Sequence, residues 1–255
     1  MGKLNRLLIT IMTVGFVLGL PDFATAQSGP ITIASGEWQL QADWQDHTGA
    51  TKRGTVLLLH KAAGNRAAYG RMATVLAEHG YASLRIDLRG HGDSTNVRAF
   101  DPNISRYKDE NDPAVSANFE LIDEGYIDIV AAIRWLDQQG KLHGAPFAVI
   151  GSSYTGEQMA VATDEAGFAD AYIALAPGNF SDASIRKVDP SGKPWLFVRA
   201  QREMSFFDDL FTAISDGTNA EIWVLPGRGH ATDLFETNDG LEERLVTWLD
   251  QQLDR

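Results

Sequence analysis

The pattern of hydrophobic and polar positions changes after the first two strands that the sequence predicts. Residues 31–34 and 37–44 read as short strands. The second alternates in part, with apolar residues at Trp38, Leu40, Ala42 and Trp44. Such alternation is typical of an antiparallel sheet with one solvated face. Residues 55–59 instead form a continuous apolar run, which predicts a strand buried on both faces.

After that run, apolar segments of strand length alternate with segments of helix length. The further predicted strands are 82–86, 147–150, 171–175, 195–198 and 221–225. The predicted helices are 67–78, 119–139, 155–163, 206–214 and 240–253. Strands and helices that alternate in this way are joined by right-handed crossovers. The sequence therefore predicts an α/β fold, with a mostly parallel central sheet, helices on both faces and antiparallel strands at its N-terminal side.

The first 26 residues have the layout of a secretory signal. Lys3 and Arg6 precede an apolar run over residues 7–20, and a small-residue A-T-A pattern follows at residues 24–26. This is the order of a signal peptide, and the run is shorter than the roughly 20 apolar residues that span a bilayer. We expect these residues to be removed and residues 27–255 to be exported, to the periplasm or outside the cell, as one domain without a stable membrane span. An uncleaved membrane anchor is the alternative.

Composition narrows the classes of function. Hydrophobic residues make up 44% of the chain, which suits a globular domain and excludes an intrinsically disordered chain. The absence of cysteine excludes a disulfide scaffold, a thiol nucleophile and a cysteine-ligated metal. The formal net charge is −12, and it becomes −13 without residues 1–26. Such a surface repels phosphate backbones, so we expect no nucleic-acid partner.

The strongest candidate for chemistry is Ser153, in the sequence Gly151-Ser152-Ser153-Tyr154-Thr155. It lies between a predicted buried strand and a predicted helix, where a tight turn presents a nucleophile at the carboxyl end of a sheet. The N-terminus of the following helix supplies backbone N–H groups that suit an oxyanion. Two alternatives remain: Ser153 only caps the helix, or the neighbouring Ser152 is the nucleophile.

In this segment the chain resembles the α/β-hydrolase family, and the resemblance covers essentially all of the chain after residue 26. The family's G-x-S-x-G motif is matched by Gly151 and Ser153 but departs at Thr155, with Gly156 one residue later. Ser152 lacks a glycine two residues before it, which makes Ser153 the better match.

The resemblance also implies a histidine and a carboxylate. The family's catalytic histidine follows the last strand, often as G-x-G-H, and His230 completes a G-R-G-H sequence there. The family's acid follows the preceding strand, where Glu203 stands, with Asp208 and Asp209 as runners-up. A neutral imidazole can take the serine proton and return it to the leaving group, while the acid orients the ring.

Both residues also have structural alternatives. His230 could be a surface histidine in a glycine-rich turn, and Glu203 could be a surface charge paired with Arg199 or Arg202. The chain order of serine, acid and histidine is that of the α/β-hydrolases, and it favours the catalytic roles.

An oxyanion needs two backbone donors, and the resemblance gives their positions. One is the N–H of Tyr154, directly after the nucleophile, and the other is in the loop after the strand at 55–59, where by position Ala62 donates. Lys61 stands where the family commonly has glycine. Its ammonium either lies near the pocket and favours acidic substrates or is solvated.

Residues 87–94 resemble the family's D-x-R-G-x-G-x-S turn, which we interpret as structural. We expect His91 in this turn to make a local hydrogen bond. A metal site built from His60 and His91 would need more ligands than the spacing offers. We therefore expect neither a metal nor a cofactor.

The leading hypothesis is an exported serine hydrolase that cleaves an ester or related acyl bond of a small molecule through Ser153, Glu203, His230 and an acyl-enzyme. Residues 177–193, where many family members insert a lid, are few, so the chain resembles the compact dienelactone-hydrolase and small-esterase branches. The irregular stretch from Gly92 to Asn118 is an alternative cover for the site. A peptidase, a thioesterase or acyltransferase, and a non-catalytic binding module stay open, as do the acyl group and the oligomeric state.

Overall fold

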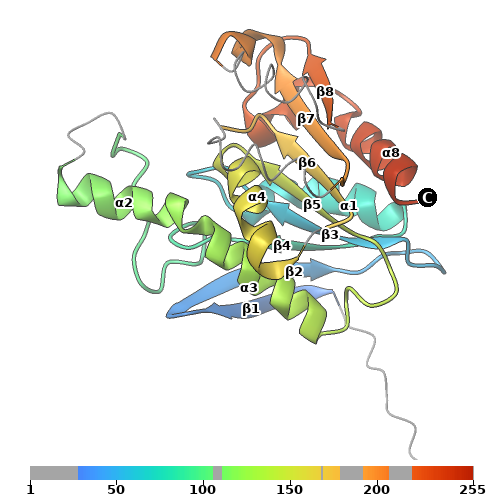
Figure 1. Cartoon of the computed structure of the whole chain (residues 1–255), viewed down its shortest axis with the longest axis horizontal. Helices are drawn as coiled ribbons and strands as arrows, with labels where there is room; N and C mark the ends of the chain where they lie inside the picture. Colours follow the sequence, from blue (N-terminus) through green and yellow to red (C-terminus); the bar gives the residue numbers. More distant parts are fainter. Residues whose placement is uncertain (1–27, 106–110, 168, 179–191, 207–219, 255) are drawn as a thin grey trace, which may run out of the picture.

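The computed structural model describes residues 28–105, 111–167, 169–178, 192–206 and 220–254 (Figure 1). The predicted signal peptide, the predicted helix 206–214 beyond its first residue, and the runners-up Asp208 and Asp209 lie outside the described residues. Among the described residues, no helix combines the length and the apolar character that crossing a membrane requires.

The described strands form one eight-stranded sheet in the order β1-β2-β4-β3-β5-β6-β7-β8 (Figure 1). They are β1 Gly29–Ser35, β2 Trp38–Gln45, β3 Gly54–Leu59, β4 Tyr81–Ile86, β5 Phe147–Ser152, β6 Ala171–Leu175, β7 Trp195–Ala200 and β8 Ala220–Leu225. β2 pairs antiparallel with β1 and β4, and the other neighbours are parallel. The predicted mostly parallel sheet with antiparallel N-terminal strands is confirmed.

Helices cover both faces of this sheet. The described helices and 3₁₀ turns are η1 Arg66–Tyr69, α1 Gly70–Glu78, α2 Pro113–Asp123, α3 Gly125–Gln138, α4 Tyr154–Ala166, η2 Gln201–Phe206, η3 Ala231–Asp233, α7 Leu234–Thr237 and α8 Leu241–Leu253. Alternate residues of a strand point to opposite faces. In β3, Val56 and Leu58 therefore pack with α1 and α8, whereas Leu57 and Leu59 pack with α3 and α4.

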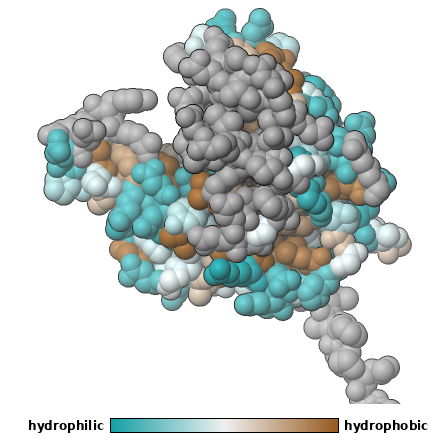
Figure 2. All heavy atoms as spheres, viewed as in Figure 1, coloured by the Kyte–Doolittle hydropathy of each residue, from teal (hydrophilic) through white to brown (hydrophobic). Residues whose placement is uncertain are grey.

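Burial follows each strand's place in the sheet. β3, β5, β6 and β7 are buried along their whole length, which explains their continuous apolar runs. β8 lies at the edge, where only Leu225 is buried and Val224 is 47% exposed. On the face seen in Figure 2, hydrophilic residues cover much of the described surface, with smaller hydrophobic patches between them.

The prediction of one helix over residues 119–139 is wrong. Two helices, α2 and α3, meet at Glu124, and α2 begins at Pro113, inside the stretch expected to be irregular. Asp112 starts α2, because its side chain accepts a hydrogen bond from the N–H of Ala114 (2.9 Å) and proline suits the first helical position. At the break, Glu124 accepts a hydrogen bond from the guanidinium of Arg89. The break thus falls at a residue held by a tertiary contact, directly before Gly125, where the apolar pattern continues.

A buried carboxylate joins three parts of the fold. Asp128 of α3 is fully buried, and its Oδ1 accepts a hydrogen bond from the hydroxyl of Ser35 (2.7 Å) at the end of β1. The backbone N–H of Arg89, in the turn after β4, donates to Oδ2 (2.8 Å), and its guanidinium donates to Oδ1 (2.9 Å). A buried charge is tolerated when it is paired and hydrogen-bonded in this way.

Asp128→Ala leaves the buried Arg89 without its main counter-charge. We expect the free energy of unfolding, measured by urea denaturation, to fall by about 3–5 kcal/mol. Asp137→Ala is the matched control on the same helix, because the Asp137 side chain is 64% exposed. It should change stability by less than about 0.5 kcal/mol. Equal effects of the two substitutions would show that the Asp128 network does not stabilise the fold.

Candidate active site

Ser153 occupies a strained turn between β5 and α4. Its φ is +58°, a left-handed value that non-glycine residues rarely adopt. The Ser153 N–H donates to the carbonyl of Leu175 (2.9 Å), and the Ser153 carbonyl accepts from the N–H of Gly156 (3.0 Å). At position 151 a Cβ would lie 2.8 Å from the carbonyl oxygen of Thr155, so glycine is required there. The predicted sharp strand-to-helix turn is therefore present.

The departure from G-x-S-x-G has a structural reason. The Thr155 hydroxyl lies inside the turn, where it accepts a hydrogen bond from the N–H of Ser152 (2.6 Å). Gly156 packs against Pro177, since a Cβ on Gly156 would lie 2.7 Å from the Pro177 Cβ. The glycine needed for close packing is thus displaced by one residue.

Ser152, the rival nucleophile, is fully buried. Its hydroxyl donates to the carbonyl of Leu59 at the end of β3 (3.0 Å), so it is held in the core. Between the two serines, only Ser153 contacts an imidazole.

His230 lies between Ser153 and Glu203. Its Nε2 is 2.9 Å from the Ser153 Oγ, and its Nδ1 is 2.8 Å from the Glu203 Oε1. With the proton on Nδ1, the ring donates to the carboxylate and accepts from the serine hydroxyl. Glu203 comes from η2, directly after β7, and His230 follows β8. The structure therefore brings together the three residues that the sequence singled out.

Arg199 adds a positive charge beside this cluster. It is fully buried at the end of β7, and burial lowers the pKa of its guanidinium to about 10, with the charge of Glu203 acting in the opposite direction. Arg199 therefore stays protonated at neutral pH. Its guanidinium donates a hydrogen bond to the carbonyl of Pro177, which ties β7 to the segment after β6. Glu203 bonds to His230 and is not simply a surface charge.

The two expected oxyanion donors lie at the ends of neighbouring strands, Ala62 after β3 and Tyr154 after β5. The carbonyl of Lys61 accepts hydrogen bonds from the His60 Nδ1 (2.7 Å) and the Gly64 N–H (3.0 Å). In a trans peptide, the Ala62 N–H points the opposite way. Within the described chain, neither the Ala62 nor the Tyr154 N–H donates to a protein acceptor. Both are available to an oxyanion.

His60 and His91 are structural residues. The His60 Nε2 accepts from the N–H of Leu88 (3.0 Å), so both of its ring nitrogens are engaged with backbone. The His91 Nδ1 bonds to the carbonyl of Arg89 (2.9 Å), which confirms the expected local bond, and the His91 ring stacks on Phe100. Among the described residues, no cluster of ligands could hold a metal ion.

The structure gives the Lys61 ammonium a partner that neither expectation named. It forms an ion pair with Asp233, three residues after His230. Sequence reasoning missed Asp233 as a partner; the available signal was a lysine at a position where the family commonly has glycine.

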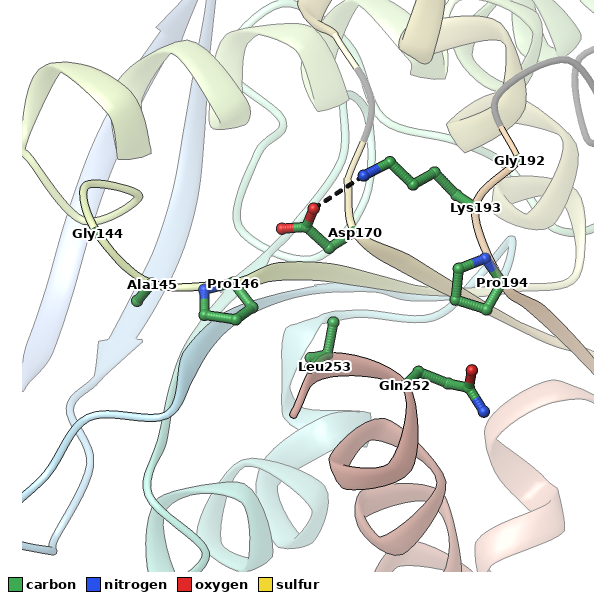
Figure 3. A pocket seen from close by; sticks show the side chains of 9 residues that line it. All are labelled: Gly144, Ala145, Pro146, Asp170, Gly192, Lys193, Pro194, Gln252 and Leu253. Carbon is green, nitrogen blue, oxygen red and sulfur yellow. Dashed lines mark hydrogen bonds and ion pairs between the residues drawn. The ribbon is translucent and has the colours of Figure 1, made fainter. Parts of the chain in front are cut away.

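A hollow of about 480 Å³ lies at the amino ends of the parallel strands, opposite the ends that carry Ser153 and His230 (Figure 3). It is lined by loop residues that precede β5, β6 and β7 and by the end of α8. Its charged residues, Asp170 and Lys193, are 3.0 Å apart in an ion pair. No nucleophile lies beside a base among the residues that line it. The candidate chemistry is therefore at the carboxyl ends of the strands, called the carboxyl edge below.

Comparisons with known proteins give a family match and similar folds. The family described as "Serine aminopeptidase, S33" matches residues 50–184. No curated protein sequence matches the chain.

Three solved structures illustrate the similarity in fold. A dienelactone hydrolase from Anabaena variabilis has 17% identity and a TM-score of 0.63, over 89% of this chain and 96% of that chain. An esterase from Pyrococcus furiosus has 16% identity and a TM-score of 0.67, over 89% and 91%. An α/β serine hydrolase without lid from Xanthomonas campestris has 17% identity and a TM-score of 0.62, over 88% and 95%.

The buried His60 should make stability depend on pH. Burial lowers the pKa of its ring to about 3, and the His91 ring acts in the same direction. The unfolded chain, with a pKa near 6.5, binds the proton first as the pH falls. Stability should therefore fall from about pH 6.5 towards pH 3, by up to roughly 1.4 kcal/mol per pH unit.

Urea denaturation at a series of pH values tests this. His60→Gln removes the titrating ring, so its stability should decline less steeply below pH 6.5 than that of the wild type. His143→Gln is the control, because the His143 side chain is 73% exposed, and it should follow the wild-type slope. Parallel curves for all three proteins would contradict the assignment of His60 as neutral in the folded state.

Proposed function

The chain belongs to the α/β-hydrolase family described as "Serine aminopeptidase, S33", and we propose that it is an exported serine hydrolase that cleaves an ester or related acyl bond. The observation that carries the proposal is the continuous hydrogen-bonded row from Ser153 through His230 to Glu203, with distances of 2.9 Å and 2.8 Å. This is the arrangement that activates a serine hydroxyl.

The proposed reaction begins when the Ser153 Oγ attacks the acyl carbonyl and His230 takes its proton at Nε2. The negative charge that develops on the carbonyl oxygen is stabilised by the free N–H groups of Ala62 and Tyr154. His230 then gives its proton to the leaving group, which departs and leaves an acyl-enzyme. A water molecule, deprotonated by the same imidazole, releases the acid, while the Glu203 carboxylate stabilises the imidazolium in both steps.

The short segment over residues 177–193 favours a small or medium ester over a substrate that needs a large lid. The similar structures described as a dienelactone hydrolase, an esterase and a serine hydrolase without lid favour the same class.

A peptidase is the second candidate, because the matching family is described as a serine aminopeptidase. A panel of p-nitrophenyl esters, thioesters and aminoacyl p-nitroanilides discriminates between these substrates.

Ser153→Ala removes the proposed nucleophile. We expect kcat/KM for short p-nitrophenyl esters to fall by roughly 10⁴-fold or more, and Glu203→Gln to lower it by about 10³–10⁴-fold. Ser152→Ala is the matched control, since this neighbouring hydroxyl is buried against the Leu59 carbonyl. It should keep most of the activity.

Labelling with a fluorophosphonate probe locates the nucleophile directly. The adduct should form on Ser153 in the wild type and in the Ser152→Ala variant, and it should be absent from Ser153→Ala. An unlabelled wild type would favour a binding module on this scaffold, and an adduct on Ser152 would overturn the assignment of the nucleophile.

Export is proposed from the layout of residues 1–26. When the full chain is produced in a Gram-negative host, N-terminal sequencing of the periplasmic protein should begin at Gln27. A full-length protein recovered with the membranes would instead indicate an uncleaved anchor.

A further inference from the structure

An ion pair joins the two loops that would hold the oxyanion and the general base. Lys61 Nζ lies 2.6 Å and 2.7 Å from the two carboxylate oxygens of Asp233. Lys61 directly precedes Ala62 in the loop after β3. Asp233 is the last residue of η3, which begins directly after His230. Residues 172 positions apart in the chain are therefore bound side chain to side chain.

Hydrogen bonds hold the backbone at both ends of this ion pair. On one side, the Lys61 carbonyl is bound by the ring of His60 and by the N–H of Gly64, and the fully buried His60 is anchored in turn to Leu88. On the other side, the N–H of Asp233 donates to the carbonyl of His230 (3.1 Å). A shift of either loop is therefore transmitted to the other.

The sheet by itself does not connect these loops closely. β3 and β8 are separated by β5, β6 and β7, so three strands lie between the backbone that carries Ala62 and the backbone that carries His230. Catalysis needs donor and base placed to well within 1 Å of their productive positions, since a 1 Å displacement can cost about 100-fold in rate. The ion pair spans this gap directly.

We propose that Lys61 is a positioning residue: its ion pair with Asp233 holds the Ala62 N–H and the His230 ring at the separation that the reaction of the proposed function requires. The inference rests on that function. It gives Lys61 no contact with substrate, and it makes the lysine a requirement of turnover rather than of folding.

Lys61→Met and Asp233→Asn each break the pair. We expect either substitution to lower kcat for a p-nitrophenyl ester by about tenfold, with KM changed by less than about twofold, because geometry and not binding is affected. The double variant should be no slower than either single variant, because both remove the same interaction. Additive losses, or an unchanged kcat in Lys61→Met, would overturn the proposal.

Lys193→Met is the matched control. Its ion pair with Asp170 joins the same two residue types at the opposite edge of the sheet (Figure 3), with side-chain exposures of 36% and 47% against 27% and 49% for Lys61 and Asp233. Partly exposed pairs contribute little to stability. Lys61→Met and Lys193→Met should therefore melt at similar temperatures, and only Lys61→Met should lose kcat. If Lys61→Met alone melted much earlier, the pair would be structural.

The dependence of kcat on salt concentration separates a positioning role of Lys61 from a purely structural one. Raising sodium chloride from about 0.05 M to 1 M weakens exposed ion pairs. The kcat of the wild type should fall over this range, whereas that of Lys61→Met should stay level. Equal salt dependence in the two proteins counts against the proposal.

If the wild type neither hydrolyses any ester of the panel nor reacts with the fluorophosphonate, the proposed function is wrong. The coupling of the loops is then read from NMR: Lys61→Met should shift the Ala62 amide and His230 ring signals together, and Lys193→Met should shift neither. If the Ala62 and His230 signals do not both move, the two loops are not coupled through Lys61.

Discussion

The carboxyl edge of the sheet depends on one backbone constraint, the positive φ of Ser153, which costs an L residue about 1–3 kcal/mol. The strand β6 compensates by accepting the Ser153 N–H at Leu175, and Gly151 lets strand and helix approach closely enough to keep the turn tight. The other non-glycine residues with positive φ in the described chain are Ala63, Ala176 and Ala231. They lie in the segments that follow β3, β6 and β8, and Ala231 comes directly after His230. The strained backbone therefore gathers at the edge where the candidate chemistry lies, while the body of the sheet is regular.

Two of the charges buried beneath this edge lie against a charge of opposite sign. Arg89 lies against Asp128, and the fully buried Asp87 accepts hydrogen bonds from the backbone and the side chain of Arg66. Such pairs add little net stability compared with apolar packing, but their directional bonds select one arrangement of the loops. The neutral His60 positions the backbone of Lys61 and Leu88 through hydrogen bonds and adds no charge. In this cysteine-free chain, these loops are thus held by hydrogen bonds, ion pairs and packing.

Sequence reasoning succeeded where one physical cause dominates a residue's pattern. The strands β3, β5, β6 and β7 were predictable because burial on both faces demands unbroken apolar runs. Ser153, His230 and Glu203 were named through the resemblance to the α/β-hydrolases, and each follows a strand whose carboxyl end lies at the same edge of the sheet. The break between α2 and α3 was not predictable, since the apolar period continues through it. Nor was the bond from Lys61 to Asp233, because nothing local to either residue encodes a partner so far along the chain.

The contrast in burial between β7 and β8 has a consequence for how the protein fails under heat. Glu203 follows a fully buried strand, whereas His230 follows an exposed strand that pairs on one side only within the described sheet. Edge elements with few buried contacts open at lower free energy than the core. Fraying of β8 separates the imidazole from a serine turn that stays intact. For the proposed function, we expect activity to be lost reversibly before the fold melts cooperatively, so that the outermost strand and not the core sets the temperature range.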